Sequence, residues 1–115
     1  MKVLIVEPDP SVRDGLSELL VASKLEVCTA TSGNQAIKIF NAELPQVVLM
    51  ALSLPLGCGR YVMNELAKLP KPPGVVVLTA EENPDLPAYK GPLAVLQKPA
   101  DPIAIIQAVM KVSVQ

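Results

Sequence analysis

PQVVLMA, residues 45–51, is the stretch of the chain that decides the fold. Residues 47–50 are all apolar, which is typical of a β-strand covered on both faces. The sequence LPLGCG at residues 54–59 follows as a loop, because it combines proline with two glycines. We therefore expect a buried strand over residues 47–52, of the kind found in parallel sheets with helices on either side.

Further strands and helices are expected to alternate around this strand. Short apolar runs predict strands at residues 3–6, 27–30, 75–78 and 93–96. Asp-Pro at 9–10 and at 101–102 predicts two helix starts, because aspartate caps free amides and proline fits the first helical position. Ser32 followed by Gln35 has the form of a capping box. The first helix is expected at about residues 10–23, with its inward side chains at Val12, Leu16, Leu19 and Leu20. The second should follow Ser32 and bury Ala36, Ile37 and Phe40. Two more helices are expected at about residues 59–69 and from residue 102 onward.

This alternation predicts an α/β fold, a doubly wound sheet of parallel βαβ units. Five strands in the flavodoxin-like order 2-1-3-4-5, with helices on both faces, fit the length of 115 residues, which is that of one domain spanning 1–115. Sites in such sheets lie at the carboxyl ends of the strands. Glu7, Ala51 and Thr79 fall at that edge, and Lys98 falls just beyond the fifth strand.

Composition and charge exclude several classes of function. The net charge of −1 gives no broad basic surface for nucleic acid. No apolar run approaches the roughly 18 residues that span a bilayer. Cys28 and Cys58 are isolated and lack metal-ligand spacing, so we expect reduced, structural thiols in a cytoplasmic protein.

Four segments together resemble the receiver domain of bacterial response regulators: residues 1–7, 45–51, 78–80 and 96–99. The resemblance covers nearly the whole chain and implies the receiver-type fold described above. In that family the last residue of the third strand is the aspartate that accepts a phosphoryl group. Here it is Ala51, whose methyl group has no oxygen that could attack phosphorus.

The acidic pocket that the resemblance implies is also depleted. In the family, two adjacent acidic residues after the first strand hold Mg²⁺, and these positions are Glu7 and Pro8 here. Asp9, shifted by one, is either the helix cap or a displaced ligand. With Ala51 in place of an aspartate, only Glu7 and the Ser53 carbonyl would remain as family-type ligands, and we expect no bound metal and no cofactor.

Thr79 and Lys98 match the residues with which the family senses the phosphoryl group. They either persist as architecture, with the cis peptide that the family has at the lysine–proline bond, or retain a ligand-sensing role. Lacking an aspartate at position 51, Lys98 is expected to pair with Glu7. Val95 occupies the position of the family's aromatic switch, so a rotating ring is absent.

Two features point to an unusual surface. Pro84 and Pro87 lie where the resemblance implies a fourth helix, which should therefore be short, irregular or missing. The last helix has a sheet-facing stripe of Ile105, Val109 and Val112. Its second apolar stripe, Ile103, Ile106 and Met110, either packs beside the proline-rich segment or forms a partner or dimer surface.

The sequence thus predicts a degenerate, phosphorylation-independent receiver, an interaction or regulatory module in two-component signalling. Its expected partners are proteins of a bacterial signalling pathway, and a second copy in a homodimer is a further candidate. No nucleic acid or membrane is expected to bind through this domain. The alternative is a receiver still phosphorylated, or metal-bound, through Glu7 or Asp9. An enzyme is not expected, because no nucleophile–base pair, histidine or glycine-rich phosphate loop is present.

Overall fold

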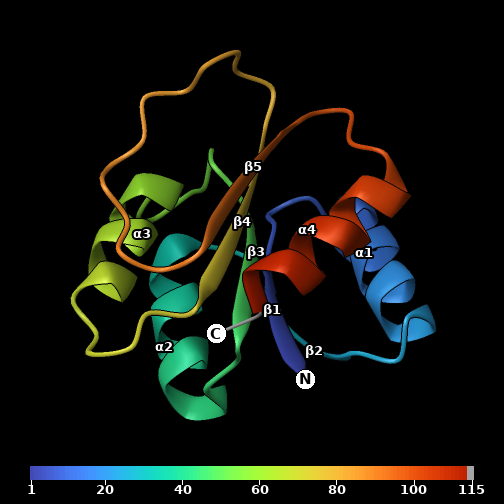
Figure 1. The fold of residues 1–115 in the computed structure, drawn as a ribbon, viewed down its shortest axis with the longest axis horizontal. Helices are drawn as coiled ribbons and strands as arrows, with labels where there is room; N and C mark the ends of the chain where they lie inside the picture. Colours follow the sequence, from blue (N-terminus) through green and yellow to red (C-terminus); the bar gives the residue numbers. More distant parts are fainter. Residues whose placement is uncertain (114–115) are drawn as a thin grey trace.

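The computed structural model describes residues 1–113 and contains one five-stranded sheet. Every pair of neighbouring strands is parallel, and their order is β2-β1-β3-β4-β5, as predicted (Figure 1). The strands are β1 (Lys2–Val6), β2 (Glu26–Ala30), β3 (Val47–Ala51), β4 (Gly74–Thr79) and β5 (Leu93–Gln97). β3 and β4 are buried along their whole length, which is why they read as unbroken apolar runs.

Three of the four helices in residues 1–113 begin at the predicted caps, which are Asp9, Ser32 and Asp101, whereas the third helix follows Cys58 and has no side-chain cap. The helices are α1 (Pro10–Ala22), α2 (Gly33–Glu43), α3 (Gly59–Ala67) and α4 (Pro102–Ser113). Asp9 accepts a hydrogen bond from the Ser11 amide at 2.9 Å, and Asp101 accepts one from the Ile103 amide at 2.7 Å. Both aspartates satisfy amides that have no partner inside the first turn of a helix.

Two hydrophobic cores lie on opposite faces of the sheet. The core on one face is formed with α2 and α3 and includes Phe40, Val48, Met50, Met63 and Val77. The core on the other face is formed with α1 and α4 and includes Ile5, Leu16, Leu49, Val76 and Ile105. Val12 was expected inward but is 39% exposed, because it lies in the first turn of α1, before the helix reaches the sheet.

The connection between β4 and β5 contains no helix, as the two prolines indicated. This segment, residues 80–92, is fixed to its surroundings by side chains. The Arg60 Nε donates to the Asp85 carbonyl at 2.8 Å, and the Tyr89 hydroxyl donates to the Pro73 carbonyl. Leu86 and Tyr89 pack against the core formed with α2 and α3.

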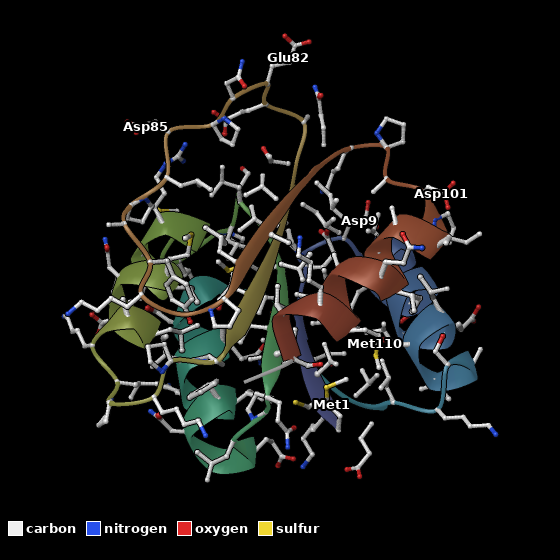
Figure 2. The ribbon with its side chains drawn as sticks, viewed as in Figure 1. Met1, Asp9, Glu82, Asp85, Asp101 and Met110 are labelled. Atoms are coloured by element: carbon white, nitrogen blue, oxygen red, sulfur yellow. The ribbon has the colours of Figure 1, made fainter. Side chains whose placement is uncertain are left out.

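The position of this segment excludes one of the two alternatives for the second apolar stripe of α4. Residues 80–92 pack on the α2 and α3 face, whereas α4 covers the other face, so the second stripe of α4 does not lie against them (Figure 1). Ile103 and Met110 are 67% and 48% exposed, while Ile106 is half-buried against the core formed with α1. Figure 2 shows Met110 on the side of α4 that is turned toward α1.

Two further properties complete the fold. Within residues 1–113, the helices are too short or too polar for any of them to cross a membrane. Both cysteines are free; Cys28 is half-buried and Cys58 is exposed.

Candidate functional site

The candidate site lies where β1, β3, β4 and β5 end at the same edge of the sheet. Glu7 follows β1, Ala51 ends β3, Thr79 ends β4, and Lys98 follows β5. The parallel register places Ala51 beside Leu78, one residue before Thr79. The structure therefore brings together the four side chains that the sequence placed at this edge.

Glu7 and Lys98 form the expected ion pair. The Lys98 Nζ lies 3.5 Å from the Glu7 Oε1. The Glu7 side chain is only 5% exposed, and its other carboxylate oxygen accepts a hydrogen bond from the Asp9 amide at 3.0 Å. The buried carboxylate is thus paired with a charge and hydrogen-bonded, which offsets the cost of removing it from water.

Asp9 acts as a helix cap, and Pro8 contributes no carboxylate. The Asp9 Oδ1 accepts from the amides of Ser11 and Val12 at 2.9 and 3.4 Å. Of the two roles that the sequence left open for Asp9, helix cap or displaced metal ligand, the geometry supports the helix cap. Pro8 is exposed, and its carbonyl accepts a 3.4 Å hydrogen bond from Arg13.

Ala51 and Thr79 are both buried at the strand ends. Ala51 is 4% exposed, so its methyl group is enclosed rather than facing water. The Thr79 hydroxyl accepts from the Glu81 amide at 3.1 Å, and the Thr79 carbonyl accepts from the Lys98 amide at 2.7 Å. The peptide between Lys98 and Pro99 is cis, as the resemblance implied. Thr79 thus joins the end of β4 to the residue that follows β5 through its carbonyl, and its hydroxyl holds the start of residues 80–92.

The side chains at this edge do not fit the magnesium ion that receiver domains hold. Mg²⁺ requires oxygen ligands in near-octahedral geometry. Of Glu7 and Pro8, the two residues at the metal-binding positions of the family, Glu7 alone has a carboxylate, and it faces the Lys98 ammonium group instead. Among residues 1–113, no group of three or more His, Cys, Asp or Glu side chains could hold a metal ion.

Two arginines near the edge were not singled out as site residues. The Arg13 guanidinium donates to the Glu7 carbonyl at 3.0 Å and so holds the end of β1 against α1. Arg60 also lies 3.6 Å from the Glu81 carboxylate, in addition to its bond with the carbonyl of Asp85. Residues 81–85 contain three acidic side chains, and Arg60 is the one arginine of α3. This pairing of opposite charges is the sequence signal that could have indicated the contact.

A hollow of about 310 Å³ lies between residues 80–92 and β5, beside Thr79. Val95, which the sequence placed on an interaction surface, lines it and is 41% exposed. The other predicted surface residues, Ile103, Ile106 and Met110, lie on the opposite face of the sheet with α4. Val95 and the α4 stripe are therefore two separate apolar areas rather than one continuous patch.

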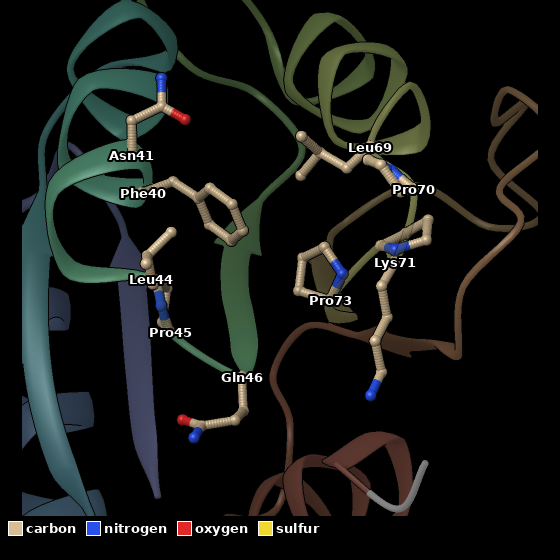
Figure 3. Close-up of a pocket in the computed structure, with 10 residues that line it drawn as sticks. Phe40, Asn41, Leu44, Pro45, Gln46, Leu69, Pro70, Lys71 and Pro73 are labelled. Carbon is tan, nitrogen blue, oxygen red and sulfur yellow. The ribbon is translucent and has the colours of Figure 1, made fainter.

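A larger hollow of about 540 Å³ lies at the other end of the sheet, near the start of β3 and β4 (Figure 3). The rings of Phe40 and Pro73 extend into it from opposite sides, and Gln46 closes one end. Its remaining walls come from the end of α2 and from the proline-rich turn after α3. None of the residues predicted for the site lines this hollow.

Comparison with known proteins agrees with the geometry. The family model of the response regulator receiver domain matches residues 3–110. The chain is 28% identical over 116 residues to an uncharacterized 14.6 kDa protein of Leptolyngbya boryana, covering 96% of this chain and 88% of that protein. It is 35% identical over 79 residues to the probable transcriptional regulator ycf27 of Porphyra purpurea, covering 69% of this chain and 32% of the regulator.

The solved structures give the same fold. A receiver domain protein from Clostridium thermocellum superposes with a TM-score of 0.85 at 20% identity, covering 97% of this chain and 93% of that one. A CheY-like receiver domain protein from Methanospirillum hungatei superposes with a TM-score of 0.80 at 25% identity, covering 97% of this chain and 90% of that one. The chain spans about a third of the ycf27 regulator that it matches. With residues 3–110 matching the family along nearly their whole length, the chain belongs to the response regulator receiver domain family.

Proposed function

We propose that this chain is a receiver domain that works without phosphorylation, as a protein-interaction module of two-component signalling. The observation that carries the proposal is the alanine at the end of β3, at the position that in receivers is the phosphoryl-accepting aspartate. A methyl group supplies no nucleophilic oxygen. Pro8 removes a second carboxylate, from the place where receivers bind the metal that neutralises the phosphoryl group.

The contacts of the remaining polar residues support the same proposal. Lys98, which in receivers pairs with the acidic site, already has the Glu7 carboxylate 3.5 Å away. The Thr79 hydroxyl accepts a hydrogen bond from the Glu81 amide. Both groups therefore have partners inside the protein, and the arrangement needs no phosphoryl group for its stability.

The alternative function is a receiver that is phosphorylated through a displaced acid. Glu7 and Asp9 are the candidates, and each is already engaged. Glu7 is buried and faces an ammonium group, and Asp9 caps α1 with its carboxylate. Attack on a phosphodonor by either side chain would first break these contacts.

Intact-mass measurement tests the choice between the two functions. The purified protein is incubated with acetyl phosphate and Mg²⁺, and its mass is compared with that of an untreated sample. We expect no mass increase. A stable increase of one phosphoryl group that disappears in Glu7→Gln or in Asp9→Asn would favour the alternative and refute the proposal.

The surfaces that would meet a partner are the ones that the sequence singled out. Val95 lies in the hollow beside residues 80–92, and the Ile103 and Met110 side chains are exposed on α4. The net charge of −1 favours a protein partner over a nucleic acid for this domain, and we place that partner in the cytoplasm.

A further inference from the structure

The larger hollow, between the end of α2 and the proline-rich turn after α3, has the dimensions of a small-molecule site. Its volume of about 540 Å³ lies within the range of roughly 300–1,000 Å³ that such sites occupy. It lies where β3 and β4 begin, at the opposite end of these strands from Ala51 (Figure 3). A molecule bound there would therefore occupy a second site, separate from the edge that contains Ala51.

The apolar walls of this hollow suit a flat ring. The Phe40 ring enters from α2, and the Pro73 ring faces it from the proline-rich turn (Figure 3). Leu44 and Leu69 add aliphatic side chains on the two sides. A flat ring removes much apolar surface from water and has little conformational freedom to lose on binding. The walls therefore favour an aromatic body over a flexible chain.

The wall formed by residues 69–73 is rigid before any ligand binds. Its three prolines have a fixed φ, and a residue that precedes proline is restricted to extended backbone. Residues 80–92 also hold this turn from behind. The Tyr89 hydroxyl donates to the Pro73 carbonyl, and a Cβ atom at Gly91 would lie 2.9 Å from that same carbonyl oxygen. A preformed wall costs a ligand little ordering on binding.

Leu44 forms the opposite wall in a conformation that favours glycine. It is the C-cap of α2, with φ 50° and ψ 56°, in the left-handed region. Its side chain is 69% exposed, so burial in the fold does not explain a leucine at this position. Strained backbone of this kind gathers at ligand sites, and Leu44 lines the hollow.

Lys71 is the one ionisable residue among those that line the hollow. It is exposed and forms no ion pair within residues 1–113. Glu43 and Glu65, on the two helices beside the hollow, are already paired with other lysines. The Gln46 side-chain oxygen accepts a backbone hydrogen bond at 2.8 Å, which leaves its nitrogen to donate. The charge and the free donor both select an anion.

We propose that this hollow binds a small aromatic carboxylate. Its ring would lie between Phe40 and Pro73, its carboxylate would meet the Lys71 ammonium group, and Leu44 would cover the ring from the α2 side. The proposal goes beyond the proposed function and does not rest on it, because it requires nothing of Ala51 or of a protein partner.

Titration of the isotope-labelled chain with naphthaleneacetate, followed by NMR, tests the site. We expect the amide signals of Leu44, Gln46 and Lys71 to shift, while those of Thr79 and Val95, at the smaller hollow, stay in place. The neutral analogue naphthaleneacetamide should bind about two- to fivefold more weakly, because it lacks the charge that pairs with Lys71. A dissociation constant above about 10 mM, or shifts confined to Thr79 and Val95, would overturn the proposal.

Lys71→Gln tests the recognition of the anion. It should remove the preference for the acid, so that naphthaleneacetate and naphthaleneacetamide bind with similar dissociation constants. Lys38→Gln is the matched control, since it removes an exposed charge of α2 that does not line the hollow. It should keep the preference. A Lys71→Gln variant that also kept it would contradict the proposal.

Leu44→Gly separates a role in ligand binding from a role in the fold. Glycine fits the left-handed backbone and little buried surface is lost, so urea unfolding should show no loss of stability. The dissociation constant of naphthaleneacetate should nevertheless rise about fivefold, because one wall of the hollow is removed. An unchanged dissociation constant, or a variant that does not fold, would count against the proposal.

Lys24→Gly is the matched control for this variant. Lys24 also has a positive φ, of 66°, and is exposed after α1, outside the hollow. Its replacement should leave the dissociation constant unchanged. The mass test of the proposed function is independent of these measurements: a phosphorylated chain would refute only that function, and a chain that does not bind naphthaleneacetate only the aromatic carboxylate site.

Discussion

The Lys98 ammonium group lies 3.5 Å from the Glu7 carboxylate, and the two partners of this pair are unequally exposed. The Glu7 side chain is 5% exposed and that of Lys98 is 37% exposed. If the pair is broken, Lys98 can still be hydrated, whereas Glu7 would keep a charge in a buried place. The cost of a mutation should therefore depend on which partner is removed.

We predict that Lys98→Met destabilises the fold more than Glu7→Gln. The first leaves the carboxylate without its cation and should cost about 1–3 kcal/mol. The second removes the buried charge, keeps an oxygen that can accept from the Asp9 amide, and should cost about 1 kcal/mol or less. Urea unfolding gives both free energies, and Lys38→Met on the exposed side of α2 is the control.

Equal losses for the two variants would mean that Glu7 is hydrated in solution. The pair would then contribute only what an exposed ion pair contributes.

A second prediction concerns restoring phosphorylation. Ala51→Asp alone should give little labelling by acetyl phosphate, because Pro8 still leaves the metal site short of a carboxylate. The double variant Ala51→Asp with Pro8→Asp should be labelled more strongly, and the label should require Mg²⁺. Intact mass with and without EDTA measures this. Full labelling of the single variant would show that Pro8 matters less than its position suggests.

Most of the fold could be predicted because local signals and burial agree. The apolar runs at residues 3–6 and 47–50 lie in β1 and β3, and the two Asp-Pro pairs stand at the starts of α1 and α4. The helix boundaries differ more: α3 ends at Ala67 rather than Leu69, since nothing in the sequence before Pro70 fixes the last turn. The proline-rich turn was visible as a turn, but its contribution to a hollow with Phe40 was not.

At the candidate site, strand ends could be predicted and tertiary contacts could not. Glu7 and Lys98 are 91 positions apart, and only the receiver resemblance brought them together. The sequence left open whether the second apolar stripe of α4 packs beside residues 80–92, because it carries no signal for the face of the sheet on which that segment lies. The side chains of Leu86 and Tyr89 decide that question by packing on the α2 and α3 face.

Tyr89 gives a prediction about alkaline pH. Burial raises the pKa of its phenol above the ordinary value of about 10. Above that pH the unfolded chain loses this proton while the folded chain keeps it, so the free energy of unfolding falls as pH rises. Below about pH 10 the phenol is protonated in both states, and its contribution to the free energy of unfolding is fully present.

As the pH rises from about 9 to about 11, the free energy of unfolding of Tyr89→Phe should therefore fall less than that of the native chain. At neutral pH it should be less stable by about 1 kcal/mol, through loss of the hydrogen bond to the Pro73 carbonyl. Tyr61→Phe is the control, because Tyr61 is 39% exposed. Urea unfolding at each pH gives the values, and identical alkaline losses in all three proteins would contradict the prediction.

Gly33 gives the last prediction, because it lies where α2 meets the loop that follows β3. The Gly33 amide donates to the Pro55 carbonyl at 3.1 Å, and the next amide, of Asn34, donates to the Leu56 carbonyl at 2.8 Å. A Cβ atom at position 33 would lie 1.7 Å from the carbonyl oxygen of Gly57. Gly33→Ala must therefore displace backbone and break these bonds, and should cost more than about 2 kcal/mol.

Gly15 is the matched control, since a Cβ atom there meets nothing within 4 Å and α1 is exposed at this position. Gly15→Ala should stabilise the fold by about 0.4–1 kcal/mol, because alanine reduces the freedom of the unfolded chain. Urea unfolding of the two variants gives changes of opposite sign if the contact holds in solution. A Gly33→Ala variant as stable as the native chain would show that the loop over residues 53–58 moves away from α2 at no cost, and that the edge around Ala51 is not held by this contact.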